Sequence, residues 1–293
     1  MPDTFSEADT RKSIWDNTIR SFAPKKYVLK EVLNIESTDA WNNYFYRKSR
    51  TSLTGGTGSD VGGIPRGAPF PFVEKGVTLV NVIPEQYGAE GVIYWQDVMT
   101  NNLRIEELTI YDVTDTIVNK IDQVIYNTLS ENDTPVNINT VAISAGYEWD
   151  SGTLQNRDPV KDILNAIKEI TTDGYDILSS GQGYLIVNET DYVNLMSNSK
   201  IVNHPTFTRA SGIIANGNLG ELCGLKIKVT PSVTADKALV VYGQKCGSWK
   251  QVAPLKVDVI EDPQSKYTIR ASEFGVCTLE APEAVCLITN TRA

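Results

Sequence analysis

The chain has 293 residues, of which 41% are hydrophobic and 22% are charged, with a formal net charge of −9. This composition suits one large domain or two modest ones, and it excludes a disordered, collagen-like or disulfide-built protein. The negative charge argues against a general nucleic-acid binder. No apolar run approaches the ~20 residues that span a bilayer. The N-terminus lacks the apolar core of a secretory signal, which favours folding in a cytoplasm.

Residues that commonly carry chemistry are sparse. The four cysteines form no C-x-x-C pair, and the single histidine, His204, is close to none of them in sequence. We therefore expect reduced, mostly buried thiols, and neither a metal site nor a bound cofactor. The sequence holds no dinucleotide-binding glycine motif, P-loop, nucleophile elbow or H-E-x-x-H zinc motif. It therefore predicts a protein that is not an enzyme.

Residues 1–45 are predicted to form an N-terminal arm. Residues 1–50 carry nine Lys or Arg against seven Asp or Glu, a balance of +2 that leaves −11 for the rest of the chain. This contrast indicates that the arm contacts a different partner from the rest of the chain, either an acidic protein surface or nucleic acid. An arm surrounded by solvent, with no partner, fits the charge equally well. Helical spacing predicts one short helix over Ser13–Phe22, and Lys26–Val32 is predicted to be extended.

A dense aromatic group, Trp41 with Tyr44–Tyr46, precedes a stretch rich in glycine and proline, Gly55–Pro71. The aromatic group predicts an anchor, either in the protein's own core or at an interface between subunits. The stretch has little apolar surface to bury and much chain entropy to lose, so we do not expect it to fold alone. It is either a linker or a limb that docks on another subunit.

Two strand-like runs follow, Val77–Val82 and Gly91–Trp95, separated by the turn-like PEQYGAE. Their simplest assembly is a long hairpin. Apolar residues then recur at helical spacing from Asn102 to Ser130, which predicts a helix roughly 40 Å long that Asp133 and Pro135 stop. The mean helix has about 11–12 residues, so this helix crosses a whole domain.

The second half of the chain mixes strands and helices. A strand is expected over Val136–Ala145, and a helix begins at the N-cap Asp158 with Pro159 and ends at Gly174. Residues 197–220 are rich in loop-forming sequence. The whole pattern is α+β, without the repeated β-α-β units of a doubly wound fold. A further helix is predicted for Thr190–Met196, and further strands for Tyr184–Val187, Leu225–Val229, Ala238–Tyr242, Leu255–Ile260, Tyr267–Ala271 and Ala284–Thr289.

Five stretches of sequence stand in a recognisable order. They are the segment from Gly55 to Trp95, IYWQDVMTNNLRIEELTIYDVTDTIVNKIDQVIYNTLSE from Ile93, YLIVNETDYVNLM from Tyr184, GLKIKVTPSVTADKALVVYG from Gly224 and SEFGVCTLEAPEAVCLIT from Ser272. In this order they resemble the major capsid proteins of tailed viruses with the Hong Kong 97 fold, over residues 40–290. The resemblance implies an N-terminal arm (1–45), an extended E-loop hairpin with flanking strands (46–98), a long spine helix with a P-domain strand (99–150), an A-domain (151–253) and strands that return to the P-domain (254–293).

The same resemblance implies a structural head protein that self-assembles through hexamers and pentamers into an icosahedral shell around double-stranded DNA. It implies scaffolding and portal proteins as partners, non-specific contact with the packaged DNA, a possible decoration protein and no membrane. The location implied is the virion capsid, assembled in the host cytoplasm. The contact residues expected are Gly55, Gly56, Gly62, Gly63, Arg66 and Lys75 in the E-loop, Trp15, Lys25 and Lys26 in the arm, and His204, Phe207 and Arg209 in an axial loop of the A-domain.

Two other functions stay open from the sequence. An encapsulin-like nanocompartment has the same fold but holds cargo enzymes in place of a genome, and a β-rich tail or adhesin protein would form trimers or other discrete oligomers. Neighbouring terminase, portal or protease genes would favour the virus, and a peroxidase or ferritin-like gene would favour the compartment. The segment before the E-loop is too short for a scaffolding segment, so scaffolding is expected to be a separate protein or the original start lies elsewhere.

Overall fold

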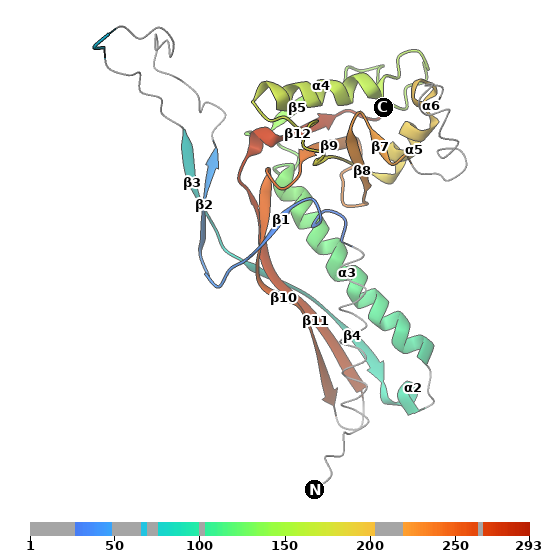
Figure 1. Cartoon of the computed structure of the whole chain (residues 1–293). Helices are drawn as coiled ribbons and strands as arrows, with labels where there is room; N and C mark the ends of the chain where they lie inside the picture. Colours follow the sequence, from blue (N-terminus) through green and yellow to red (C-terminus); the bar gives the residue numbers. More distant parts are fainter. Residues whose placement is uncertain (1–26, 49–65, 69–75, 100–102, 203–218, 263–265) are drawn as a thin grey trace. The chain divides into compact units, whose positions relative to one another are not determined.

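The computed structural model describes residues 27–48, 66–68, 76–99, 103–202, 219–262 and 266–293 (Figure 1). These residues divide into two compact units, and each unit combines segments that are distant in sequence. The first unit contains the described parts of residues 1–43, 83–128 and 248–277, and the second those of residues 44–82, 129–247 and 278–293.

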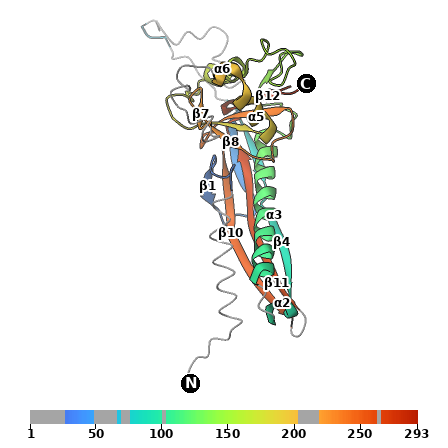
Figure 2. The same ribbon diagram turned by 90° about the vertical axis from the view of Figure 1, so that its right-hand side faces the viewer.

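The first unit is built on a four-stranded sheet in the order β1-β10-β11-β4. β1 runs parallel to β10, and β4 runs antiparallel to β11 with Tyr94 opposite Lys266. Helix α3 runs along this sheet (Figures 1 and 2). The elements of the unit are β1 (Asn34–Ser37), β4 (Glu85–Tyr94), α2 (Trp95–Met99), α3 (Leu103–Leu129), β10 (Gly247–Asp262) and β11 (Lys266–Leu279).

Close contact between β4 and α3 depends on a glycine. A Cβ atom added at Gly91 would lie 2.5 Å from Thr109 Cγ2 and 2.7 Å from Val113 Cγ2, so a larger residue would push the strand away from the helix. The neighbouring inward residue of β4, Ile93, is fully buried. Inward-facing residues of β4 therefore alternate along the strand with exposed residues, as expected for a sheet that is covered on one side.

The long helix predicted from periodicity is confirmed, since α3 has 27 residues. Its end lies within one residue of the predicted Ser130, and Asp133 belongs to the turn that follows. Three successive residues, Glu131, Asn132 and Asp133, have left-handed backbone with φ of 52°, 55° and 60°. The Glu131 carboxylate accepts the backbone N–H groups of Val136 and Asn137 at 2.6 and 2.8 Å, which holds this turn. A local turn therefore ends the helix before Pro135, and the strand that follows is only β5 (Asn139–Ala142).

The second unit is built on a six-stranded mixed sheet in the order β5-β12-β9-β6-β8-β7. β6 is parallel to β8 and β12 is parallel to β5, whereas β9 is antiparallel to both β12 and β6, so the sheet is mixed and not doubly wound. The further elements are α4 (Pro159–Thr172), β6 (Gly183–Val187), α5 (Glu189–Ser197), α6 (Ser199–Val202), β7 (Glu221–Leu222), β8 (Leu225–Val229), β9 (Lys237–Tyr242), the 3₁₀ helix η1 (Pro282–Ala284) and β12 (Val285–Thr289).

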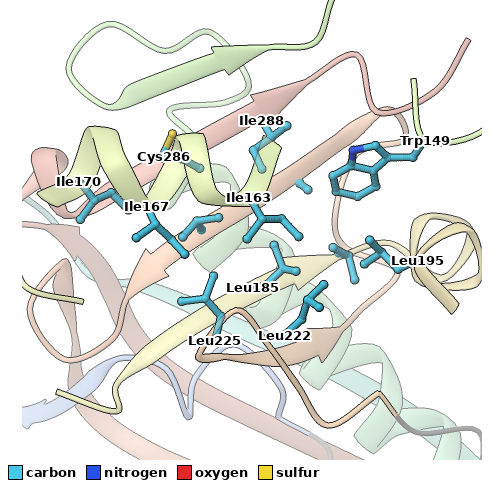
Figure 3. Close-up of a cluster of buried hydrophobic side chains, with 14 of the residues drawn as sticks. Trp149, Ile163, Ile167, Ile170, Leu185, Leu195, Leu222, Leu225, Cys286 and Ile288 are labelled. Atoms are coloured by element: carbon cyan, nitrogen blue, oxygen red, sulfur yellow. The ribbon is translucent and has the colours of Figure 1, made fainter. Parts of the chain in front are cut away.

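The core of the second unit lies between α4 and the sheet (Figure 3). Ile163, Ile167 and Ile170 project from one face of α4 at helical spacing toward buried strand residues such as Leu185. The helix is capped as predicted, because the Asp158 side chain accepts the Lys161 N–H. Local caps and an apolar stripe are sufficient to define such a helix.

The pairing of strands around residues 43–94 differs from the predicted hairpin. β3 (Val77–Val82) pairs with β2 (Asn43–Lys48), and these two strands form a separate sheet that we call the β2–β3 ribbon. The sequence PEQYGAE was predicted to be a turn, yet residues 85–90 belong to β4 and pair with β11. The predicted extension over Lys26–Val32 is also wrong where the chain is described, since residues 27–33 form turns and β1 begins at Asn34.

Candidate functional site

The described residues contain no group of three or more His, Cys, Asp or Glu side chains that could hold a metal ion. The four cysteines are thiols, three of them buried and Cys223 half-buried, as the sequence predicts. Burial raises the pKa of the Cys246 thiol to about 12, which makes it a poor nucleophile. No helix in the described part of the chain has the length and apolar character needed to cross a membrane.

Of the contact residues expected from the sequence, only Arg66 falls in the described part of the chain. It is exposed in a short turn beside Gly67, which has φ of 86°. The others lie outside the described residues, so their roles stay predictions. They are Gly55, Gly56, Gly62, Gly63 and Lys75, Trp15, Lys25 and Lys26, and His204, Phe207 and Arg209.

The β2–β3 ribbon carries apolar side chains that are exposed among the described residues. Tyr44 and Tyr46 are 59% and 68% exposed, and Val77 and Leu79 are 48% and 56% exposed. Between the tyrosines, Phe45 is only 6% exposed. Phe45 therefore anchors the ribbon in the protein's own core, and an interface role for the exposed Tyr44 and Tyr46 stays a prediction. An isolated two-stranded hairpin is marginally stable in water, so this ribbon needs a further surface to pack against.

A buried polar cluster lies in the first unit, where the Glu273 carboxylate accepts three donors. Tyr27 Oη lies 2.7 Å from Oε2, while Lys30 Nζ at 2.5 Å and Trp249 Nε1 at 3.1 Å contact Oε1. Glu273 is 1% exposed and Lys30 is 8% exposed. A buried carboxylate is tolerated only when it is paired and hydrogen-bonded, and this one is both. The cluster fastens residues 27–30, which lie within the predicted arm of residues 1–45, to strands β10 and β11.

A second buried carboxylate fastens the same segment to helix α3. Asp122 accepts the backbone N–H groups of Val28 and Leu29 at 3.1 and 3.2 Å. Burial raises the pKa of the Asp122 carboxyl from 3.8 to about 6, although the backbone N–H groups oppose the shift. This part of the predicted arm is therefore attached to the rest of the first unit by two buried acids, and no motif in the sequence marks either of them.

The raised pKa of Asp122 predicts an unusual pH dependence. The folded carboxyl binds a proton at pH values where the unfolded carboxyl is ionised, so this group stabilises the fold as the pH falls from about 6 toward 4. Relative to Asp122→Asn, the free energy of unfolding of the wild type should rise by about 1 kcal/mol between about pH 7 and pH 5. Urea unfolding of the unassembled protein at the two pH values measures this change.

The matched control is Glu131→Gln. Burial acts to raise the pKa of the Glu131 carboxyl, but hydrogen bonds from the Asn137 side chain and from backbone N–H groups outweigh it and lower that pKa. Its contribution to stability is therefore present above its unfolded pKa and is lost as the pH falls through its folded pKa. The two variants should differ in the sign of their pH dependence, and the same sign for both would contradict the assignment.

A family model described as phage capsid protein matches residues 80–287. Comparison with the sequences of curated proteins gives no match. Among solved structures, a virus-like particle from Pyrococcus furiosus has a TM-score of 0.65 at 12% identity, covering 97% of this chain and 100% of that one. A structure from Mycobacterium phage Che8 has a TM-score of 0.65 at 15% identity, covering 91% and 92%.

The mature capsid of bacteriophage PhiM1 has a TM-score of 0.59 at 12% identity, covering 90% of this chain and 87% of that one. At such identities these likenesses show the fold, and they agree with the α+β architecture of the two units. The family model spans more than half of the chain. The chain therefore belongs to the phage capsid protein family and has the Hong Kong 97-like capsid fold.

Proposed function

We propose that this shell protein is the major head protein of a tailed virus and assembles into a closed icosahedral shell around packaged double-stranded DNA. The observation that carries the proposal is the β2–β3 ribbon, whose strands leave apolar side chains exposed in a chain of the capsid family. Such a ribbon gains stable packing only when a neighbouring copy covers it. In the names of the family, the ribbon is the base of the E-loop and α3 is the spine helix.

Assembly would follow from limbs that become ordered on docking. The ribbon of one copy lies on the next copy, and such a head-to-tail contact closes into pentamers and hexamers. Each copy then contributes several weak contacts whose combined strength exceeds that of any one. The free subunit is therefore metastable and assembly is cooperative, with the axial loop around His204 near the symmetry axis and the arm around Lys25 on a further neighbour.

The charge distribution supports a shell that encloses DNA without holding it tightly. Residues 51–293 carry a net charge of −11, obtained from −9 for the chain minus +2 for residues 1–50. A negative surface does not retain a polyanion, so contact with DNA would be non-specific. The other proposed binding partners are scaffolding, portal and decoration proteins. The shell would assemble in the host cytoplasm and then form the capsid of the virion.

Negative-stain microscopy of the purified protein tests the proposal directly, since closed hollow shells are the expected result. Trimers or other discrete oligomers would contradict it and would favour a tail or adhesin protein. Deleting residues 55–71 should abolish closed shells, because it removes the stretch that the ribbon carries. A variant with a Gly-Ser linker of the same length separates loss of sequence from loss of length. Normal shells from the deletion variant would refute the docking role.

A cargo compartment is the second candidate, because the Pyrococcus furiosus virus-like particle is as similar in fold as the phage structures. The contents of particles isolated from the native source distinguish the two. Nuclease-protected DNA supports the viral head, and protected enzyme without DNA supports the compartment. The shell architecture is common to both, so this result changes only what the shell is proposed to hold.

A further inference from the structure

We propose that Lys48 and Tyr175 form a latch that fixes the direction in which the β2–β3 ribbon leaves the second unit. The inference rests on the proposed function, in which the ribbon is the limb that contacts a neighbouring copy. Lys48 is the last residue of β2, and Tyr175 follows helix α4. Lys48 Nζ donates a hydrogen bond of 2.7 Å to Tyr175 Oη.

Tyr175 is a rigid point of attachment. The backbone N–H of Tyr175 bonds to Ile170 O at 3.3 Å, and that of Gly174 bonds to Thr171 O at 3.0 Å. Gly174 has φ of 90°, so α4 ends in the left-handed glycine cap that leaves the following residue in a defined position. The Tyr175 ring also meets the Tyr242 ring edge-on, with centroids 6.2 Å apart. Helix cap and ring contact together hold the hydroxyl in place.

Lys48 contacts Tyr175 through both the hydroxyl and the ring. Lys48 Nζ lies 2.7 Å from the hydroxyl oxygen and 4.8 Å from the ring centroid, over the ring. A hydrogen bond with an ionised donor is stronger than one between neutral groups. Removing the hydroxyl alone therefore removes the main interaction and leaves the packing of the ring unchanged.

The other contacts of this end of β2 reach only one chain segment. Lys48 N bonds to Glu280 O at 3.0 Å, and Arg47 Nε bonds to Leu279 O at 3.3 Å. Side chains at successive strand positions point to opposite faces, so Arg47 and Lys48 reach out from different sides. Together with the buried Phe45, these bonds attach the ribbon to its unit, and the bond to Tyr175 adds an attachment to a separate element.

The direction of the limb matters for the shell because the angle between neighbouring copies sets whether rings and shells close. A latch that holds one direction favours one curvature. Without it the ribbon samples a range of directions, and the copies join at a range of angles. The structure thus assigns to Lys48 and Tyr175 a positioning role in the choice of shell size, while contact with the neighbour is made elsewhere on the ribbon.

Tyr175→Phe and Lys48→Met, each in the full-length chain, test the latch. Amide exchange of residues 44–48 and 77–82 in the unassembled subunit should become about two- to tenfold faster. Thermal stability should stay close to that of the wild type, and the diameters of assembled particles should spread over a wider range. Lys48→Arg keeps a cationic donor and should restore the wild-type values. Tyr147→Phe removes a hydroxyl from an exposed tyrosine of the same unit and should change neither readout.

The two proposals fail in distinguishable ways. A wild type that forms no shells refutes the proposed function, while amide exchange in the subunit still measures the latch. Wild-type exchange rates in both Tyr175→Phe and Lys48→Met overturn the latch, whatever the particles look like. The latch is also overturned if Lys48→Met speeds exchange further in the Tyr175→Phe background, because two residues that act through one bond must not have additive effects.

Discussion

Glu273→Ala is expected to lower the free energy of unfolding by about 3–5 kcal/mol. The substitution leaves the Lys30 ammonium buried without its carboxylate, and it removes the acceptor of the Tyr27 hydroxyl and the Trp249 indole N–H. Unsatisfied buried donors and an unpaired buried charge are among the most costly changes to a fold. Urea unfolding followed by tryptophan emission measures the loss in the unassembled subunit.

Glu90→Ala is the matched control for this loss. Glu90 lies on β4 in the same unit and pairs with Arg270, but both side chains are about half exposed. An exposed ion pair contributes about 0–1 kcal/mol, so this variant should be nearly as stable as the wild type. Lys30→Met with Glu273→Gln removes the charge pair and keeps an acceptor, and it should lose less than Glu273→Ala. Equal losses from Glu273→Ala and Glu90→Ala would contradict the role of burial.

Tyr44→Glu combined with Leu79→Glu is expected to abolish shell formation without unfolding the subunit. Both side chains are more than half exposed within their own unit, so the folded subunit loses little contact. In the assembled shell the same positions would be covered, and burying two carboxylates without partners opposes association. Light scattering during assembly, together with thermal unfolding of the subunit, separates the two effects.

Val136→Glu is the control for a new charge outside the ribbon, since Val136 is 79% exposed in the same unit. This variant should assemble like the wild type. Phe45→Ala makes the opposite comparison, because Phe45 is buried beside Tyr44 on the same strand and its loss should weaken the subunit itself. Normal shells from the Tyr44→Glu and Leu79→Glu double variant would remove the ribbon from the assembly interface.

The elements predicted well are those whose determinants are local. Helix α3 follows from apolar periodicity, and α4 follows from Asp158, Pro159 and Gly174 at its ends. The strands Val77–Val82 and Leu225–Val229 were predicted with the bounds that the structure has. Each of these signals lies within one turn or one strand of the element it defines, so neighbouring residues are sufficient to specify it.

The elements predicted poorly depend on distant partners. Residues 85–90 resemble a turn, but β11 supplies a hydrogen-bonded ladder that outweighs their weak strand propensity. β3 pairs with β2, although the glycine- and proline-rich stretch separates them in sequence, and the residues within each strand do not identify this partner. Glu273 had one available signal, since it occupies an inward position of β11 between the buried residues Ala271 and Gly275. An acid at such a position calls for a buried partner, but only the folded chain identifies Lys30.

Composition, helical periodicity and the order of segments were sufficient to indicate an α+β shell protein without catalytic motifs. Strand pairing, the two buried acids and the contact between Lys48 and Tyr175 were evident only in the folded chain. The physical reason is the sequence distance over which each interaction acts. Propensity and capping act over a few residues, whereas ladders, buried charges and hydrogen bonds across the sheet join groups separated by long stretches of sequence, and their free energy depends on a geometry that exists only after folding.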